Sequence, residues 1–178
     1  QTRFDEAIDY GDRAIAIGEE SGSPRVLAYG HAFRCWALIS AGRSREGAAS
    51  SETALSLVPR LTDERDSRYI RLKGGYGAVL GHLQPGDLIK ARALAKDLMD
   101  FAIGTDSARA RSFAHAAAAA CHNVSGDSAR CIAELERARE IAPDPIYRLV
   151  AEQNLCSALA LSGQFETARA ILDPALQH

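Results

Sequence analysis

The chain has 178 residues, 47% of them hydrophobic and 25% charged, and 21 basic side chains against 23 acidic ones give a net charge of -2. This balance leaves no excess of positive charge for a nucleic-acid backbone. The apolar content argues against disorder, and no run of 18 apolar residues is present to span a membrane. We therefore expect a soluble globular protein with no nucleic-acid partner and no membrane partner.

Only helices are expected, because Val and Ile are scattered among Ala and Leu at helical spacing and no segment alternates like a strand. The first helix covers about 3–20 and has no partner of its own. Side-chain oxygens suited to capping a helix open the first member of each later pair, at Ser23, Thr62, Thr105 and Asp144. The predicted pairs are 24–41 with 44–58, 63–82 with 87–103, 106–124 with 127–141, and 145–162 with 165–176.

A spaced pattern of small residues recurs along these helices. A Gly is followed five residues later by a small residue and after seven more by Ala or Leu, in copies that begin at Gly42, Gly86, Gly126 and Gly163. A fifth copy lacks the Gly but keeps Ala7 and Ala14. The small positions are 37 to 44 residues apart, which defines a repeat. Each Gly is expected to adopt a left-handed conformation between two antiparallel helices.

This pattern resembles the tetratricopeptide repeat, whose turn is matched well by the segment Gly163-Gln164-Phe165-Glu166-Thr167-Ala168. The period here exceeds the family's standard of about 34 residues. It is similar to the elongated repeats of kinesin light chains and of large bacterial signalling proteins that join a nucleotide cyclase or DNA-binding domain to an ATPase. The resemblance implies an all-α fold, a right-handed superhelix of antiparallel pairs over 1–178. Its parts would be 1–22, the second helix of an incomplete repeat, and the pairs 23–60, 61–104, 105–143 and 144–178.

The resemblance also implies that the first helix of each pair lines an inner groove. When the turn glycines are aligned with those of the family, Tyr29, Phe33 and Trp36 fall at groove positions of the first pair. They form an aromatic stripe at i, i+4, i+7 spacing. The amides of Gln153 and Asn154 are suited to pairing with a peptide main chain. Two other interpretations stay open, since the stripe could belong to the core and the amides could simply be solvated.

The third pair places Phe113 at the equivalent position, beside the run 116–120 of five alanines. Such a run either leaves room in the groove or lets a neighbouring helix close tightly. The cations Arg65, Arg68 and Arg71 follow one helix and form either a solvated face or a patch for an acidic partner.

Catalytic and metal-binding motifs are missing from the sequence. No Cys-x-x-Cys or His-Glu-x-x-His occurs, and no nucleophile turn accompanies any Cys, so we predict no catalytic residue, no metal and no cofactor. The glycine-rich stretch 74–77 follows no strand, which favours close helix packing or a helix defect over a phosphate loop. The four cysteines fit a reducing cytoplasm, and three occupy small-residue slots where a buried thiol is expected: Cys35, Cys131 and Cys156.

These features together predict a non-catalytic scaffold that binds a protein or peptide. Because the chain starts at Gln1 rather than Met, we expect a processed product or a segment of a larger signalling protein. The alternatives are a small-molecule sensor that controls an attached cyclase or transcription module, and an enzyme that uses Cys121 with a histidine. Apolar surface at the two ends is also expected to promote end-to-end self-association.

Overall fold

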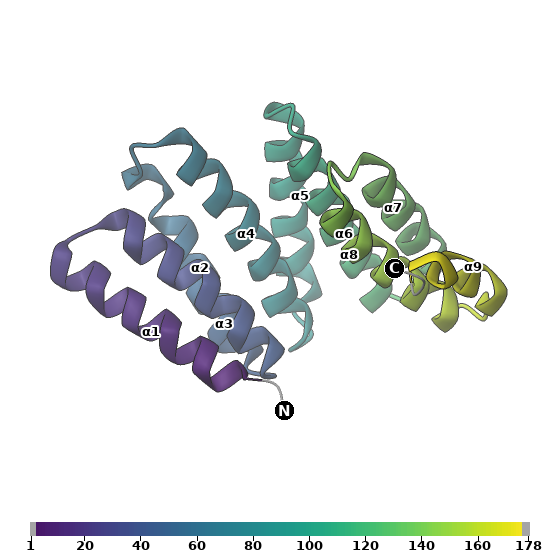
Figure 1. Cartoon of the computed structure of the whole chain (residues 1–178), viewed down its shortest axis with the longest axis horizontal. Coiled ribbons are helices and arrows are strands. Elements are labelled where there is room, and N and C mark those ends of the chain that lie inside the picture. Colours follow the sequence, from purple (N-terminus) through teal and green to yellow (C-terminus); the bar gives the residue numbers. More distant parts are fainter. Residues whose placement is uncertain (1–2, 176–178) are drawn as a thin grey trace. The chain divides into compact units, whose positions relative to one another are not determined.

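The computed structural model describes residues 3–175, and every regular element in that part of the chain is helical, as predicted. The ends of the predicted array, residues 1–2 and 176–178, lie outside the described residues. The elements are α1 (Phe4–Ser21), α2 (Pro24–Ser40), α3 (Ser44–Ser56), the 3-10 turn η1 (Val58–Arg60), α4 (Glu64–Leu83), α5 (Leu88–Gly104), α6 (Ala108–Val124), α7 (Ser128–Ile141), α8 (Pro145–Leu161) and α9 (Phe165–Ala175) (Figure 1).

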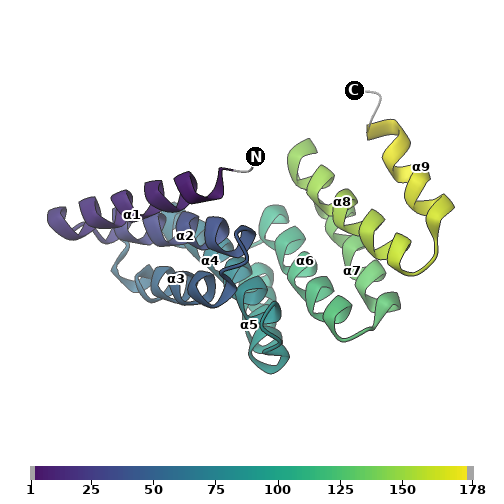
Figure 2. The ribbon, with the colours of Figure 1, turned by 90° about the horizontal axis from the view of Figure 1, so that it is seen from below.

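The helices form two compact units, one up to Leu94 and the other from Ala95, so the boundary falls inside α5. In the first unit, α1 packs against α2, α2 against α3, and α4 against both α2 and α3 (Figure 1). Its core contains Leu38 and Ile70, which are fully buried. In the second unit, α6, α7, α8 and α9 pack in chain order (Figure 2). Each unit therefore has a hydrophobic core of its own.

Close helix packing explains the glycines of α4. A Cβ on Gly77 would lie 2.7 Å from both Cys35 Sγ and Ser51 Oγ, and a Cβ on Gly81 would lie 2.8 Å from the backbone nitrogen of Ala48. Because α4 is continuous over Glu64–Leu83, the glycine-rich stretch is not a helix defect. It is the face on which α4 approaches α2 and α3.

The turn glycines have the left-handed conformation that the repeat pattern predicted. Their φ angles are 79° at Gly42, 92° at Gly86, 76° at Gly126 and 77° at Gly163. An L-residue with a side chain would be strained at these positions, which is why Gly recurs there.

Two of the four predicted helix caps are confirmed. Ser23 accepts a hydrogen bond from the Val26 nitrogen, and Asp144 accepts from the nitrogens of the second and third helical residues. The other two predictions were wrong by one or two residues, because Asp63 and Ser107 supply the capping oxygens in place of Thr62 and Thr105.

The predicted helix 44–58 was too long, since α3 ends at Ser56 and η1 follows. Pro59 lies inside η1 and lacks the amide proton that a continued helix requires.

The small-residue slots five residues after each turn glycine are buried, at Gly47, Ala91, Cys131 and Ala168. Ala7, the corresponding residue of α1, is exposed.

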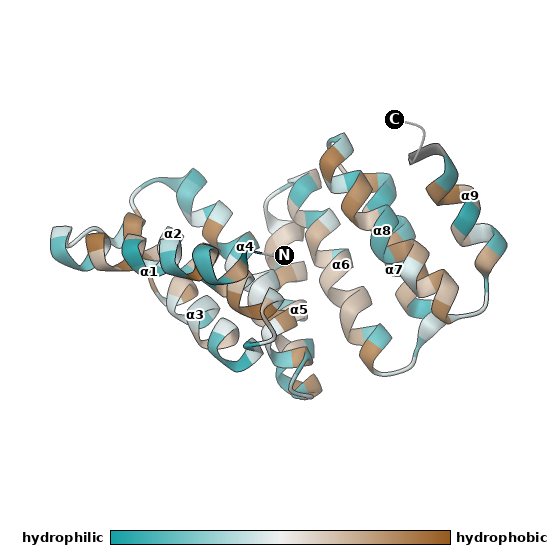
Figure 3. Ribbon diagram, turned by 60° about the horizontal axis from the view of Figure 1, so that its bottom comes forward, coloured by the Kyte–Doolittle hydropathy of each residue, from teal (hydrophilic) through white to brown (hydrophobic). Residues whose placement is uncertain are grey.

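Polar residues interrupt the apolar ones along the helices (Figure 3). Within residues 3–175 no helix combines the length and the apolar character needed to cross a bilayer.

Candidate functional site

Aromatic side chains of α2 and α4 meet on one surface of the first unit. The Tyr29 and Tyr69 rings stack with their centroids 5.4 Å apart, and the Phe33 ring lies 6.2 Å from Tyr29 and 6.3 Å from Tyr69. Further along the two helices, Trp36 lies 5.4 Å from the Tyr76 ring. We call this the aromatic surface, made of Tyr29, Phe33 and Trp36 on α2 and of Tyr69, Lys73 and the buried Tyr76 on α4.

Helical spacing explains why these residues share one surface. Residues four or seven apart on a helix lie on the same side, as Tyr29, Phe33 and Trp36 do on α2 and Tyr69, Lys73 and Tyr76 do on α4. Since α2 and α4 pack against each other, the two stripes are brought together. The aromatic surface is therefore formed by α2 and α4, the first helices of two successive helix pairs.

A buried carboxylate fixes one end of the aromatic surface. The Tyr29 hydroxyl donates to Asp66 Oδ1 at 2.8 Å, and Arg25 Nε lies 2.6 Å from Asp66 Oδ2. Asp66 is only 6% exposed. Burial and the hydrogen bond to Asp66 raise the pKa of Tyr29 to about 12. The Tyr29 hydroxyl and the Arg25 guanidinium hold the pKa of Asp66 below its ordinary value.

The side chains of the predicted stripe differ in exposure. Phe33 is 54% exposed, whereas Tyr29 and Trp36 are half-buried. The Lys73 ammonium lies 5.4 Å from the centre of the Trp36 ring. The Trp36 Nε1 atom is buried and has no acceptor among the described residues. The stripe is thus partly core and partly surface, with Phe33 as its most accessible ring.

Phe113, the sequence-predicted residue of the third pair, is buried in the second unit, where its ring meets Tyr147 edge-on at 5.2 Å. Arg109 lies 3.6 Å from Asp144 and stands over the Tyr147 ring at 4.8 Å. The first unit pairs the corresponding residues, Arg25 with Asp66 and Tyr29 with Tyr69, although its two rings stack rather than meet edge-on. We call this combination of an Arg–Asp ion pair and a ring pair the interhelix clasp. In it, Phe113 holds α6 against α8.

Gln153 and Asn154 are both exposed on α8. The Asn154 amide nitrogen donates one hydrogen to the Val150 carbonyl of its own helix at 2.9 Å, which leaves the amide oxygen and the second N–H for a ligand. These two residues belong to the second unit and Tyr29, Phe33 and Trp36 to the first.

Sequence reasoning missed the contribution of α4. A signal for it was present, because Tyr76 and Lys73 lie ten and thirteen residues before Gly86, as Ala32 and Tyr29 do before Gly42. Applying the same register to the second pair would have identified both. Tyr69 falls outside those register positions, so only its contacts reveal it.

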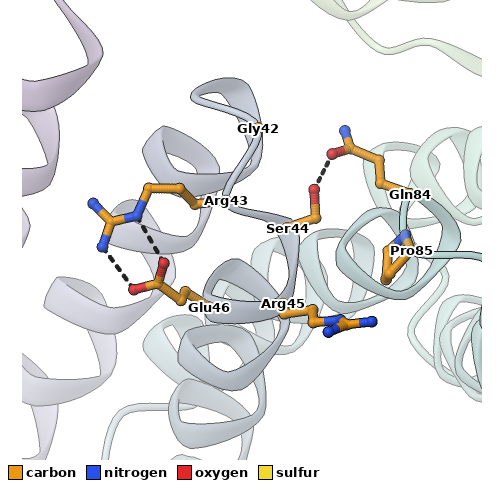
Figure 4. A pocket seen from close by; sticks show the side chains of 7 residues that line it. All are labelled: Gly42, Arg43, Ser44, Arg45, Glu46, Gln84 and Pro85. Carbon is orange, nitrogen blue, oxygen red and sulfur yellow. Dashed lines mark hydrogen bonds and ion pairs between the residues drawn. The ribbon is translucent and has the colours of Figure 1, made fainter.

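A separate pocket of about 310 Å³ lies where the α2–α3 turn faces the end of α4. Arg43 makes a bidentate pair with Glu46 at 2.8 and 2.6 Å, and Ser44 donates to Gln84 (Figure 4). Most of its lining residues are exposed, so it is not an enclosed cavity of the kind a small-molecule sensor needs. None of its lining residues belongs to the aromatic surface: Gly42, Arg43, Ser44, Arg45, Glu46, Gln84 and Pro85.

All four cysteines are buried, as expected for the three in small-residue slots, and the fourth, Cys121, is buried as well. Burial raises the pKa of the Cys35 thiol to about 11 and also raises the pKa values of Cys131 and Cys156. A thiol of raised pKa is seldom ionised at neutral pH and is a weak nucleophile. Among the described residues, no group of three or more metal-ligating side chains comes together.

Comparison of the chain with protein-family models and with curated proteins finds no match.

Proposed function

We propose that the chain is a non-catalytic scaffold that binds a protein or peptide segment through the aromatic surface. The observation that carries the proposal is Phe33, a large apolar ring more than half exposed on a base of stacked tyrosines. Rings held in place by their neighbours lose little conformational freedom on binding, and aromatic anchors dominate many protein interfaces.

The interhelix clasp supports this use of the surface. With the Tyr29 hydroxyl tied to Asp66, and Arg25 paired with the same carboxylate, α2 and α4 have a fixed spacing beneath Phe33. A partner therefore meets a preformed surface. The burial of all four cysteines and the raised pKa values of Cys35, Cys131 and Cys156 favour binding over thiol catalysis.

We further propose that the paired helices form a tetratricopeptide-type right-handed superhelix within a larger cytoplasmic signalling protein. The recurrent left-handed turn glycines and the buried small residues five positions later support this assignment. On this proposal, Gln153 and Asn154 contribute hydrogen bonds to an extended partner on the second unit.

A random peptide library displayed on phage tests the proposed function. Selection on the full chain is expected to enrich peptides that bind the wild-type chain and the Ile89→Ala variant but not the Phe33→Ala variant. Ile89→Ala is the control because it shortens an 87% exposed side chain outside the aromatic surface. Circular dichroism establishes that both variants keep their helices. Equal enrichment on wild type and Phe33→Ala would refute binding at this surface.

A further inference from the structure

Cations outnumber carboxylates on the two stripes of the aromatic surface. Arg25 lies four residues before Tyr29, Arg65 lies four residues before Tyr69, and Lys73 lies four residues after it, so all three cations share the aromatic stripes. The one carboxylate at a stripe position is Asp66, three residues before Tyr69 and seven before Lys73, and it is buried. In a chain of net charge -2, this excess of cations is a local property of the surface.

The acidic residues near this surface are already engaged. Asp66 is buried and uses both oxygens, one for the Tyr29 hydroxyl and the other for Arg25. Glu64 pairs with Arg68 at 2.5 Å, and Asp63 accepts from the backbone nitrogen at the start of α4. Asp66 and Glu64 are therefore paired with cations of the same unit, whereas Asp63 keeps its charge and caps α4.

Two guanidinium groups retain donors for a partner. Arg25 approaches Asp66 through Nε, and its side chain is 69% exposed, so its terminal nitrogens extend beyond the ion pair. Arg65 is exposed and makes no ion pair within the described residues. The amino-terminal turns of α2 and α4 also meet here, as the Arg25–Asp66 contact shows, and helix amino termini add partial positive charge.

The acidic charge of the first unit is concentrated on α1. That helix carries Arg13 as its single basic residue against six acidic ones, Asp5, Glu6, Asp9, Asp12, Glu19 and Glu20. Two of the six are ion-paired, Glu6 with Arg3 and Asp12 with Arg34, and the other four make no ion pair among the described residues. An acidic partner is therefore attracted to the aromatic surface and repelled from α1, and opposite potentials of this kind select partners and steer association.

From these observations we infer that the partner of the aromatic surface is an acidic peptide segment that carries an aromatic or large aliphatic side chain. The apolar side chain packs on Phe33, and the carboxylates pair with Arg25 and Arg65. A cationic ligand is not expected to bind these rings, because the three cations on the same stripes would repel it. This inference rests on the proposed function.

The peptides selected in the phage experiment test it through their sequences. Binders that depend on Phe33 are expected to be rich in Asp and Glu around one aromatic or aliphatic residue. Phe33-dependent binders of neutral or basic composition would overturn the acidic partner while the proposed function stands. If no binder depends on Phe33, both fail.

The roles of charge are tested with one selected peptide, labelled with fluorescein and measured by anisotropy. Arg65→Gln is expected to weaken binding two- to fivefold, as for an exposed ion pair, and raising the salt concentration is expected to weaken it further. Arg45→Gln is the matched control, an exposed arginine of α3 outside the aromatic surface. Equal affinities for wild type and Arg65→Gln, or no dependence on salt, would contradict the assignment.

Discussion

The close approach of α4 to α2 and α3 predicts that Gly77→Ala destabilises the first unit, although Gly→Ala inside a helix normally stabilises by about 1 kcal/mol. The new methyl would lie 2.7 Å from Cys35 Sγ and from Ser51 Oγ, well inside the 3.4 Å at which ordinary contact begins. Both neighbours, Cys35 and Ser51, are fully buried, so making room for the methyl requires the packed core to shift. Overpacking of a core costs about 1–3 kcal/mol, and two atoms are met at once, so we take the upper part of that range, about 2–3 kcal/mol. Less the propensity gain of about 1 kcal/mol, the expected net loss is about 1–2 kcal/mol.

Urea unfolding followed by Trp36 fluorescence measures this loss, because the only Trp lies in the same unit as Gly77. Gly74→Ala is the matched control in the same helix, since its methyl would lie 3.2 Å from Leu55 Cγ and 3.3 Å from Leu55 Cδ2, a milder contact than at Gly77. Its stability should stay within about 0.5 kcal/mol of wild type, because the propensity gain offsets the closer contact. If Gly77→Ala is as stable as wild type, the packing argument is wrong.

The Ser51 hydroxyl provides an independent check of the same contact. Ser51 Oγ is buried and has no hydrogen-bond partner among the described residues, so Ser51→Ala alone should change the stability little. It removes one of the two atoms that the Gly77→Ala methyl would meet. In a double-mutant cycle the two substitutions should therefore couple favourably, by about 0.5–1 kcal/mol. Simple additivity would show that the methyl does not reach Ser51.

Three further outcomes are expected. Asp66→Asn should lower the free energy of unfolding by about 1–3 kcal/mol, because it removes the charged acceptor of two hydrogen bonds. Because the pKa of Asp66 is lowered on folding, urea titrations should show the whole difference in stability from wild type above about pH 4 and a smaller difference below it. Leu155→Ala, in the core of the second unit, should lower the stability measured by thermal unfolding by about 2–5 kcal/mol. Leu149→Ala, at a 54% exposed position, should stay within about 0.5 kcal/mol of wild type. Similar losses of stability would contradict the difference in burial between the two positions. Native cysteines should react with Ellman's reagent at pH 8 far more slowly than in urea, and a pKa of about 11 leaves about one part in a thousand of Cys35 as thiolate; fast labelling of the folded chain would show an accessible, activated thiol.

Local sequence signals predicted the helices and turns well, because those features depend on residues close together in the chain. The positive φ at each turn glycine and the caps at Ser23 and Asp144 follow from single side chains and their neighbours. The errors at Thr62 and Thr105 arose where a second capping residue stood one or two positions later, and local chemistry did not distinguish the two.

The candidate site was predicted only in part, because it depends on contacts between helices. The stripe on α2 was visible from its spacing, whereas the stacking of Tyr69 on Tyr29 brings together residues 40 positions apart. Phe113 followed the groove register in sequence, yet its burial depends on the Tyr147 ring of a later helix. The number of side chains with which an aromatic residue packs cannot be read from its own helix.

The interhelix clasp joins α2 to α4 and again α6 to α8. Arg109 follows Arg25 by 84 residues, and Phe113 follows Tyr29 by the same interval, about twice the repeat length. The pattern of contacts therefore recurs over two helix pairs, although the pattern of small residues recurs over one. Loss of any single helix pair between α2 and α9 would remove one member of one clasp, whereas loss of the two pairs that share a clasp would leave the other clasp intact. The smallest segment of this array that keeps a complete clasp is therefore two helix pairs long.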